Sequence, residues 1–177
     1  MRTGKNIKFR AGGCDLTALL IWFLCLLPLI VAAKEFPGLV VGVSDGDTIK
    51  ILDDSQQQHT IRLMGIDAPE KTQAFGQKSK QSLSGMLYGQ RVLVEWSKRD
   101  KYGRIVGKVI TSEGIDVCLE QVARGMAWHY KKYAAEQSAA DNIRYGDAEI
   151  VARTSKVGLW HDDMPMSPWI WRRSMVK

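Results

Sequence analysis

Five short segments rich in valine and isoleucine, separated by turn residues, limit the fold of this chain more than any other feature. Several of them alternate apolar and polar residues with a period of two, which is typical of strands that bury one face. The segments are residues 39–43, 48–52, 59–64, 91–96 and 104–111. The breaks between them, SDGD, DDSQQQ and KRDKYG, carry residues that favour turns. A core of short strands is therefore expected.

Helical patterns are expected in three places. Residues 73–88, between the third and fourth strands, carry an apolar stripe. A second helix is expected after Asp116, which can cap it, with Gly125 near its end. A third is expected over residues 135–156. Five strands with one inserted helix and two later ones predict a mainly β, α+β fold: a five-stranded barrel of the oligonucleotide-binding (OB) type with three helices.

The first 33 residues differ from the rest of the chain. A basic start containing Arg2, Lys5, Lys8 and Arg10 is followed by residues 18–33, which carry no charge and end in VAA. This pattern is typical of a secretory signal peptide cleaved after Ala33, and an uncleaved membrane anchor is the alternative. We therefore expect a leader (1–33), a domain (34–160) and a tail (161–177), with export to the periplasm or the medium.

Charge and cysteine content narrow the classes of partner. The net charge falls from +6 to +3 without the leader's four basic residues and one acid, which permits a polyanionic partner without requiring one. Cys118 is the one cysteine after the leader, so no internal disulfide is expected and this thiol is expected to be buried. The three histidines are scattered in the sequence and show no zinc-ligand spacing.

Two acidic motifs are expected to meet at one rim of the barrel. The motif DGDT opens the second strand and GIDAPE closes the third. In an antiparallel pair the start of one strand lies beside the end of the next, so Asp47 and Asp67 should face each other. Two adjacent carboxylates repel, and a hard cation such as Ca²⁺ removes this penalty. Each motif by itself is also typical of a plain turn.

Three further residues complete a candidate site. Glu70, held by Pro69, is placed to deprotonate or hold a water molecule. Arg62 precedes the acidic loop and Arg104 opens the fifth strand. The planar fork of arginine suits a phosphate group, so the set predicts phosphodiester cleavage. The alternative for Arg62 is a structural ion pair with one of the acids.

These motifs resemble the staphylococcal nuclease (thermonuclease) family. DGDTIKI, TIRLMGIDAPE and DKYGR occur in the order and at the separations of that family, and LEQVARGMAWHYKKYA and GLW at residues 158–160 match its later segments. The resemblance covers about residues 38–160. It implies the OB-fold barrel with three helices and a calcium-dependent hydrolase, a phosphodiesterase or endonuclease that cuts DNA and RNA and leaves 3′-phosphate ends.

The resemblance also implies a role for each matching residue. Asp47 and Asp67 correspond to calcium-binding carboxylates, and Ala68 to a position that contributes its backbone carbonyl. The remaining matches are two phosphate-binding arginines, the proposed general base and a supporting carboxylate: Arg62, Arg104, Glu70 and Asp45.

The stretch WHYKKY and the tail lie at the edge of what this resemblance covers. Aromatic rings there are candidates to stack on a base and lysines to meet phosphates, which would favour a single strand. The residues concerned are Trp128, Tyr130, Lys131, Lys132 and Tyr133. The alternative is that the rings belong to the core. The tail is expected to lie over the domain without a regular element. Trp169 and Trp171 are expected to pack there, and Arg172 and Arg173 are candidates to touch nucleic acid.

Three rival functions remain open on the sequence. The first is a nucleic-acid-binding module without catalysis on the same fold, although such modules usually lose site residues that are all present here. The second is a membrane-anchored assembly protein. The third is a phosphodiesterase for small molecules. A monomer without an obligate protein partner is expected.

Overall fold

The computed structural model describes residues 34–175. The expected leader and its cleavage point after Ala33 lie outside these residues. Within the described range, no helix combines the length and the apolar character needed to cross a membrane.

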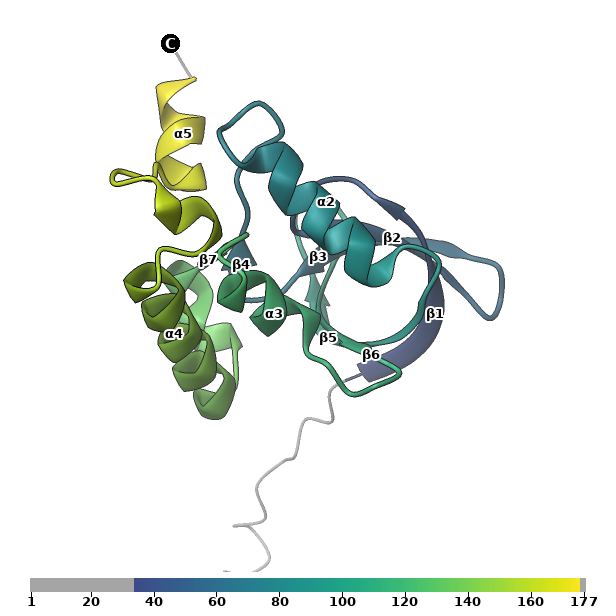
Figure 1. Ribbon diagram of the computed structural model, residues 1–177. Helices are drawn as coiled ribbons and strands as arrows, with labels where there is room; N and C mark the ends of the chain where they lie inside the picture. Colours follow the sequence, from purple (N-terminus) through teal and green to yellow (C-terminus); the bar gives the residue numbers. More distant parts are fainter. Residues whose placement is uncertain (1–33, 176–177) are drawn as a thin grey trace, which may run out of the picture. The chain divides into compact units, whose positions relative to one another are not determined.

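The described chain is built on a closed five-stranded barrel (Figure 1). Around the barrel the strands follow the order β1-β2-β3-β6-β5, and β1 pairs with β5 to close it. All pairs are antiparallel except β3 with β6. The strands are β1 (Lys34–Val43), β2 (Thr48–Asp53), β3 (Gln58–Leu63), β5 (Arg91–Arg99) and β6 (Ile105–Thr111). The predicted strands and the mixed α+β barrel are confirmed, and the first strand begins earlier than expected.

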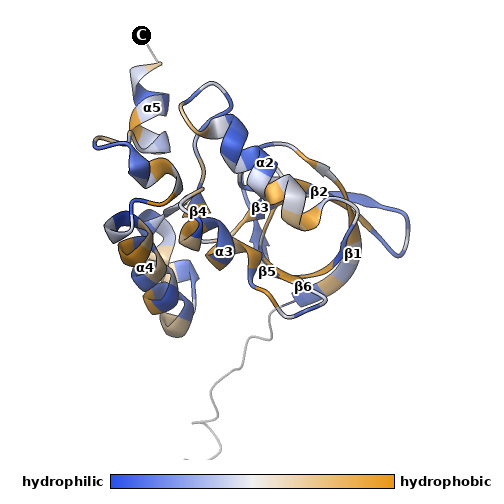
Figure 2. Ribbon diagram, viewed as in Figure 1, coloured by the Kyte–Doolittle hydropathy of each residue, from blue (hydrophilic) through white to orange (hydrophobic). Residues whose placement is uncertain are grey.

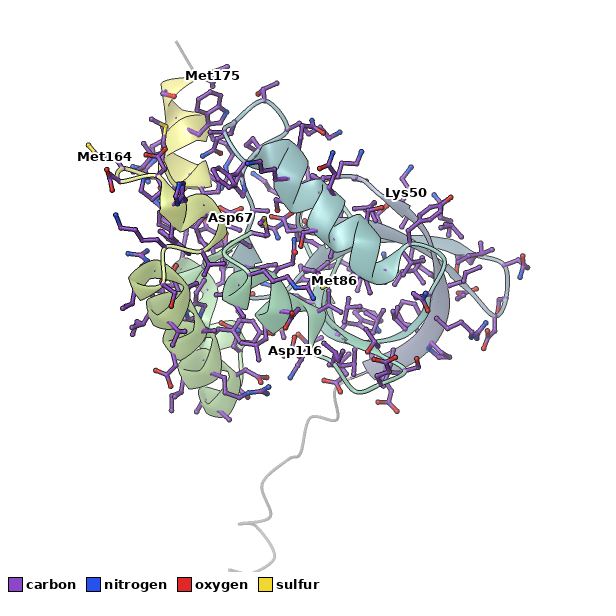
Figure 3. The ribbon with its side chains drawn as sticks, in the orientation of Figure 1. Lys50, Asp67, Met86, Asp116, Met164 and Met175 are labelled. Carbon is purple, nitrogen blue, oxygen red and sulfur yellow. The ribbon has the colours of Figure 1, made fainter. Side chains whose placement is uncertain are left out.

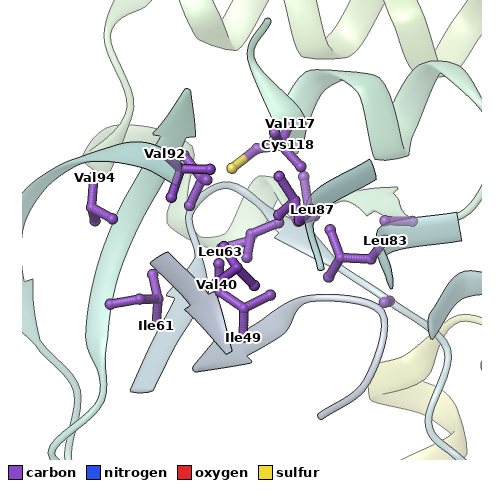
Figure 4. Packing of buried hydrophobic residues seen from close by; sticks show 14 of the residues in the cluster. Val40, Ile49, Ile61, Leu63, Leu83, Leu87, Val92, Val94, Val117 and Cys118 are labelled. Carbon is purple, nitrogen blue, oxygen red and sulfur yellow. The ribbon is translucent and has the colours of Figure 1, made fainter. Parts of the chain in front are cut away.

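The period-two pattern places one face of each strand inside the barrel. Ile49, Ile51, Ile61 and Leu63 are at most 1% exposed, and they pack with residues of β1, β5 and α3 (Figure 4). Apolar positions alternate with polar ones along the ribbon of the barrel (Figure 2). Arg62 stands between two buried neighbours and therefore faces the other way.

Three helices occur near the expected places: α2 (Gly76–Leu87), α3 (Val117–Ala123) and α4 (Ala139–Thr154). Asp116 caps α3 as predicted, because its side chain accepts a hydrogen bond from the Leu119 backbone N–H. Cys118 is fully buried, as expected, and burial raises the pKa of its thiol to about 12. The third helix starts later than expected because Ser138 caps it and residues Lys131–Glu136 form the 3-10 helix η1.

The expectation that the tail lacks a regular element is wrong. After the 3-10 helix η2 (Gly158–His161), the chain forms α5 (Pro168–Ser174). Pro168 stands in the first turn, where its missing N–H costs nothing. Trp169 packs against a second apolar cluster formed by Trp128, Ala152, Leu159 and Trp160. The side chain of Gln73 also donates to the Met166 carbonyl at 2.6 Å. These contacts hold α5 beside the barrel.

Candidate active site

The start of β2 and the end of β3 form one rim of the barrel, as the two motifs predict. Thr48 pairs with Arg62 in the ladder, and the Leu63 backbone N–H donates to the Asp47 carbonyl at 2.8 Å. Asp67 follows on the short strand β4 (Ile66–Asp67), which pairs with β7 (Trp128–His129). Both aspartates are buried, at 6% and 1% exposure.

The guanidinium of Arg62 lies between these two carboxylates. Its Nη1 is 3.0 Å from Asp47 Oδ2, and its Nη2 is 2.9 Å from Asp67 Oδ1. Nη1 also donates to the Leu63 carbonyl at 3.1 Å. The structural ion pair considered for Arg62 is therefore present. The side chain keeps 15% of its surface exposed and lines the cavity at this rim, so pairing and substrate contact do not exclude each other.

Asp47 is held by backbone and hydroxyl donors. The Ala68 backbone N–H donates to its Oδ2 at 2.7 Å, and the Thr48 hydroxyl donates to its Oδ1 at 3.1 Å. Burial raises the pKa of Asp47 to about 7, Arg62 opposes this rise, and the Asp45 and Asp67 carboxylates add to it. Arg62 therefore offsets only part of the cost of burying this carboxylate.

The glycine of the DGD motif is required by close packing. A Cβ on Gly46 would lie 1.9 Å from the Ser79 hydroxyl oxygen on α2 and 2.7 Å from the Ala68 Cβ. Gln121 Nε2 also donates to the Gly46 carbonyl at 2.9 Å. Asp45 accepts a hydrogen bond from the Asp47 backbone N–H at 3.1 Å, so it supports the turn that presents Asp47.

Glu70 lies on the loop after β4 and meets an arginine that the sequence motifs did not indicate. Arg172 of α5 donates from Nη1 to Glu70 Oε1 at 2.7 Å and from Nη2 to Asp67 Oδ2 at 2.8 Å. Its Nη1 is also 3.3 Å from Asp67 Oδ1. Figure 3 shows Asp67 on the side of the barrel that faces the C-terminal segment. The hydrogen bonds to Asp67, followed by those to Glu70, raise the pKa of Arg172.

Arg104 lies at the mouth of β6 and is oriented by Asp100. Its Nε donates to Asp100 Oδ2 at 2.7 Å, and its backbone N–H donates to Asp100 Oδ1 at 3.0 Å. Burial alone would raise the pKa of Asp100, but the Arg104 and Tyr102 hydrogen bonds hold it below its ordinary value. The carboxylate is thus a stable anchor, and it engages Nε rather than the two terminal nitrogens. Asp100 is a positioning residue that the DKYGR motif contains but does not by itself reveal.

One cavity of about 600 Å³ brings the predicted residues together. It opens at the barrel rim between β3, the loop after β4 and the turn before β6. Its lining includes every residue predicted for metal binding or catalysis: Asp45, Asp47, Arg62, Asp67, Ala68, Glu70 and Arg104. Arg172 lines the same cavity.

The WHYKKY segment divides into core and surface residues. Trp128 is 8% exposed, and its ring packs edge-on against Trp160 and Trp169, with centroids 4.2 and 5.5 Å apart. Trp128 is thus a core residue, because the pairing of β7 with β4 turns its ring into the second apolar cluster. For Trp128, the alternative that the ring belongs to the core therefore holds. Tyr130 and Tyr133 line the cavity that contains Asp47 and Asp67.

A second cavity of about 890 Å³ adjoins the first. Tyr130 and Arg172 line both, so the two are neighbours. The second is lined mainly by aromatic and basic residues, including Lys131, Lys132, Trp169 and Arg173. The Tyr130 and Trp169 rings stack at a centroid distance of 5.4 Å. Lys131 pairs with the buried Glu149 at 3.0 Å. A strip of positive charge and aromatic surface therefore leads away from the carboxylates.

The ligands available at the rim are oxygen atoms, which is the ligand type that a hard cation prefers. Among residues 34–175, no three histidine, cysteine, aspartate or glutamate side chains are grouped closely enough to hold a metal. A cation would therefore depend on Asp47, Asp67, the Ala68 carbonyl and water, all oxygen ligands of the type Ca²⁺ prefers. Both Asp67 oxygens accept hydrogen bonds from Arg62 and Arg172, so a cation on Asp67 would share these oxygens with guanidinium groups.

The protein is thus a closed barrel of the OB type with buried carboxylates and several guanidinium groups gathered in one rim cavity. Comparison of the sequence with known families identifies its relatives. A family model described as "Staphylococcal nuclease homologue" matches residues 60–162. The chain belongs to this family.

Individual relatives extend the similarity over most of the chain. An "Uncharacterized endonuclease" of Escherichia coli is 39% identical over 153 residues, which cover 86% of this chain and 94% of the relative. "Protein ParB" of Escherichia coli is 39% identical, covering 84% of this chain and 87% of the relative. "Micrococcal nuclease" of Shigella flexneri is 35% identical, with the same coverage of 84% and 87%.

Proposed function

We propose that the protein is a calcium-dependent nuclease that hydrolyses phosphodiester bonds of DNA and RNA and leaves 3′-phosphate ends. One observation carries this proposal: residues from four separate segments line a single cavity, and they include Asp47, Asp67, Glu70, Arg62 and Arg104. Membership of the staphylococcal nuclease family and the nuclease names of relatives from Escherichia coli and Shigella flexneri support it.

Each of these residues has a separate role in the proposed reaction. Arg62 and Arg104 bind oxygens of the scissile phosphate and stabilise the charge that develops on them. Glu70 takes a proton from the attacking water as the new P–O bond forms. The bond from phosphorus to the 5′ oxygen breaks, and that oxygen takes a proton from solvent. Calcium held by Asp47, Asp67 and the Ala68 carbonyl would supply positive charge against the phosphate.

The second cavity suggests where a nucleic-acid strand would lie beyond the scissile phosphate. Tyr130 and Tyr133 line the cavity that contains Asp47 and Asp67. Lys131 and Lys132 line the neighbouring second cavity. Stacking on a ring requires an unpaired base, so we propose a preference for single strands. All proposed site residues come from one chain, so a monomer is the proposed active form.

The test is an assay of the purified protein on single-stranded DNA and RNA. We expect cleavage with calcium, loss of cleavage in a chelator, recovery when calcium is restored, and products that carry a 3′ phosphate. Zinc should substitute poorly because the donors are oxygens only. Full activity in the presence of a chelator would show that Asp47 and Asp67 do not bind a metal that the reaction needs. Binding of the same strand without any cleavage would instead support a non-catalytic module.

Export is a separate proposal that follows from the apolar run at residues 18–33. We expect the exported protein to begin at Lys34, because small residues occupy the two positions that a signal peptidase reads before this point. Mass spectrometry of the protein from the periplasm or the medium measures its first residue. Recovery of a membrane-bound form that still contains Trp22 and Phe23 would favour the anchor instead.

A further inference from the structure

Arg172 forms ion pairs with Asp67, which the proposed function assigns to calcium, and with Glu70, which it assigns the role of general base. We propose that Arg172 is the exchangeable counter-ion of this site: it holds Asp67 and Glu70 in the metal-free protein, and a divalent cation must displace it to bind. The inference rests on the proposed calcium site. Arg172 lies on the C-terminal helix α5, outside the family match at residues 60–162. Under this proposal, Arg172 sets the affinity of the site for calcium.

The geometry leaves little room for both charges. Asp67 Oδ2 accepts from Arg172 Nη2 at 2.8 Å, while Oδ1 accepts from Arg62 Nη2 at 2.9 Å and lies 3.3 Å from Arg172 Nη1. Calcium binds carboxylate oxygens at about 2.3–2.6 Å. A cation on either oxygen of Asp67 would therefore lie within a few ångströms of a guanidinium. The side chain of Asp67 is only 2% exposed, so water screens this repulsion poorly.

Arg172 is the guanidinium that can leave. Arg62 stands on a barrel strand, is 15% exposed, and is also held by Asp47 and by the Leu63 carbonyl. Arg172 is 43% exposed and stands near the end of the seven-residue helix α5. Its ion pairs with residues of the site are those with Asp67 and Glu70. Its long side chain can turn into water, or toward the second cavity that it also lines.

Removal of Arg172 has a predictable electrostatic effect. Without it, Asp67 keeps one counter-ion, Arg62, and Glu70 loses the partner at 2.7 Å. The cavity becomes more negative, and calcium no longer has to displace a bound group. Calcium should therefore bind more tightly to the variant than to the parent. A role in holding the site in shape for the metal predicts the opposite, namely weaker binding.

The experiment measures calcium affinity by titration calorimetry without nucleic acid. It compares the parent protein with Arg172→Gln and with Arg173→Gln, which removes the same charge from the neighbouring residue. Arg173 lines the second cavity, and within residues 34–175 it forms no ion pair. We expect Arg172→Gln to bind calcium at least about tenfold more tightly, which corresponds to about 1.4 kcal/mol, and Arg173→Gln to stay within about twofold of the parent.

Several results would overturn the proposal. Unchanged or weaker binding by Arg172→Gln would show that Arg172 does not compete with the cation. An equal gain in both variants would show a general charge effect instead. Arg172→Lys keeps the positive charge without the guanidinium fork, so its calcium affinity should fall between those of the parent and of Arg172→Gln. This variant tests the proposal if the glutamine protein folds poorly.

A second readout follows the helix itself. If calcium displaces Arg172, hydrogen exchange of the backbone of residues 168–174 should rise when calcium is added to the parent protein. No change there would count against displacement. If neither the parent nor Arg172→Gln binds calcium at all, the calcium part of the proposed function fails together with this inference. If both bind equally and the parent cuts DNA with calcium, only this inference fails.

Discussion

Replacement of Glu70 by glutamine is expected to lower kcat by about 10² to 10⁴-fold while leaving the binding of single-stranded DNA largely intact. The amide keeps the size of the side chain and, before calcium binds, an oxygen that can still accept from Arg172, which donates to Glu70 at 2.7 Å. It cannot take a proton from water. The loss should therefore fall on the chemical step, which single-turnover kinetics on a short oligonucleotide measures.

Glu136→Gln is the matched control for this change. Glu136 lines the same cavity, but it pairs with Lys98 rather than with the residues around Asp67. The control removes the same charge from the same cavity, so it separates loss of the base from a change in local potential. Its kcat should stay within about threefold of the parent. A loss under about threefold for Glu70→Gln, in a folded protein, would show that Glu70 serves only the loop.

Arg104→Lys is expected to lower kcat by about 10² to 10³-fold, corresponding to about 3 kcal/mol. Asp100 engages Nε and the backbone N–H of Arg104, which leaves the terminal nitrogens of the fork to hold two phosphate oxygens. Lysine has one nitrogen, so it can pair with Asp100 or meet the phosphate but cannot reproduce both. The contact strengthens as charge develops on the phosphate, so KM should change much less than kcat.

The control for this change is Arg99→Lys. Arg99 lines the same cavity and donates to the Gly103 carbonyl within the same turn, so it reports on charge and on loop structure. Its kcat should change by less than about threefold. Steady-state kinetics on a short single-stranded oligonucleotide, with circular dichroism as a check of folding, compares the two variants. Arg104 would be an electrostatic or structural residue if its lysine variant kept more than about a third of the parental kcat.

Local patterns predicted the elements of the barrel because each depends on neighbours in the chain. Alternation of buried and exposed residues in β2 and β3 defines which face of each strand enters the core. Asp116 begins α3 through a hydrogen bond only three residues away. The tail shows the limit of such patterns. Residues 168–174 are too few for a clear helical period, and the packing of Trp169 depends on Trp128, which is far earlier in the sequence.

The sequence by itself determined the residues that can meet at the rim, because DGDT leads into β2, GIDAPE follows β3, and these two strands are antiparallel neighbours. Only the tertiary structure decided how their charges are balanced. Arg62 bridges both aspartates, and Arg172 reaches Asp67 across 105 positions in the sequence. No local period or spacing encodes such a contact. It arises because packing of Trp169 carries α5 to the cavity, and buried carboxylates attract whichever cation the fold brings within reach.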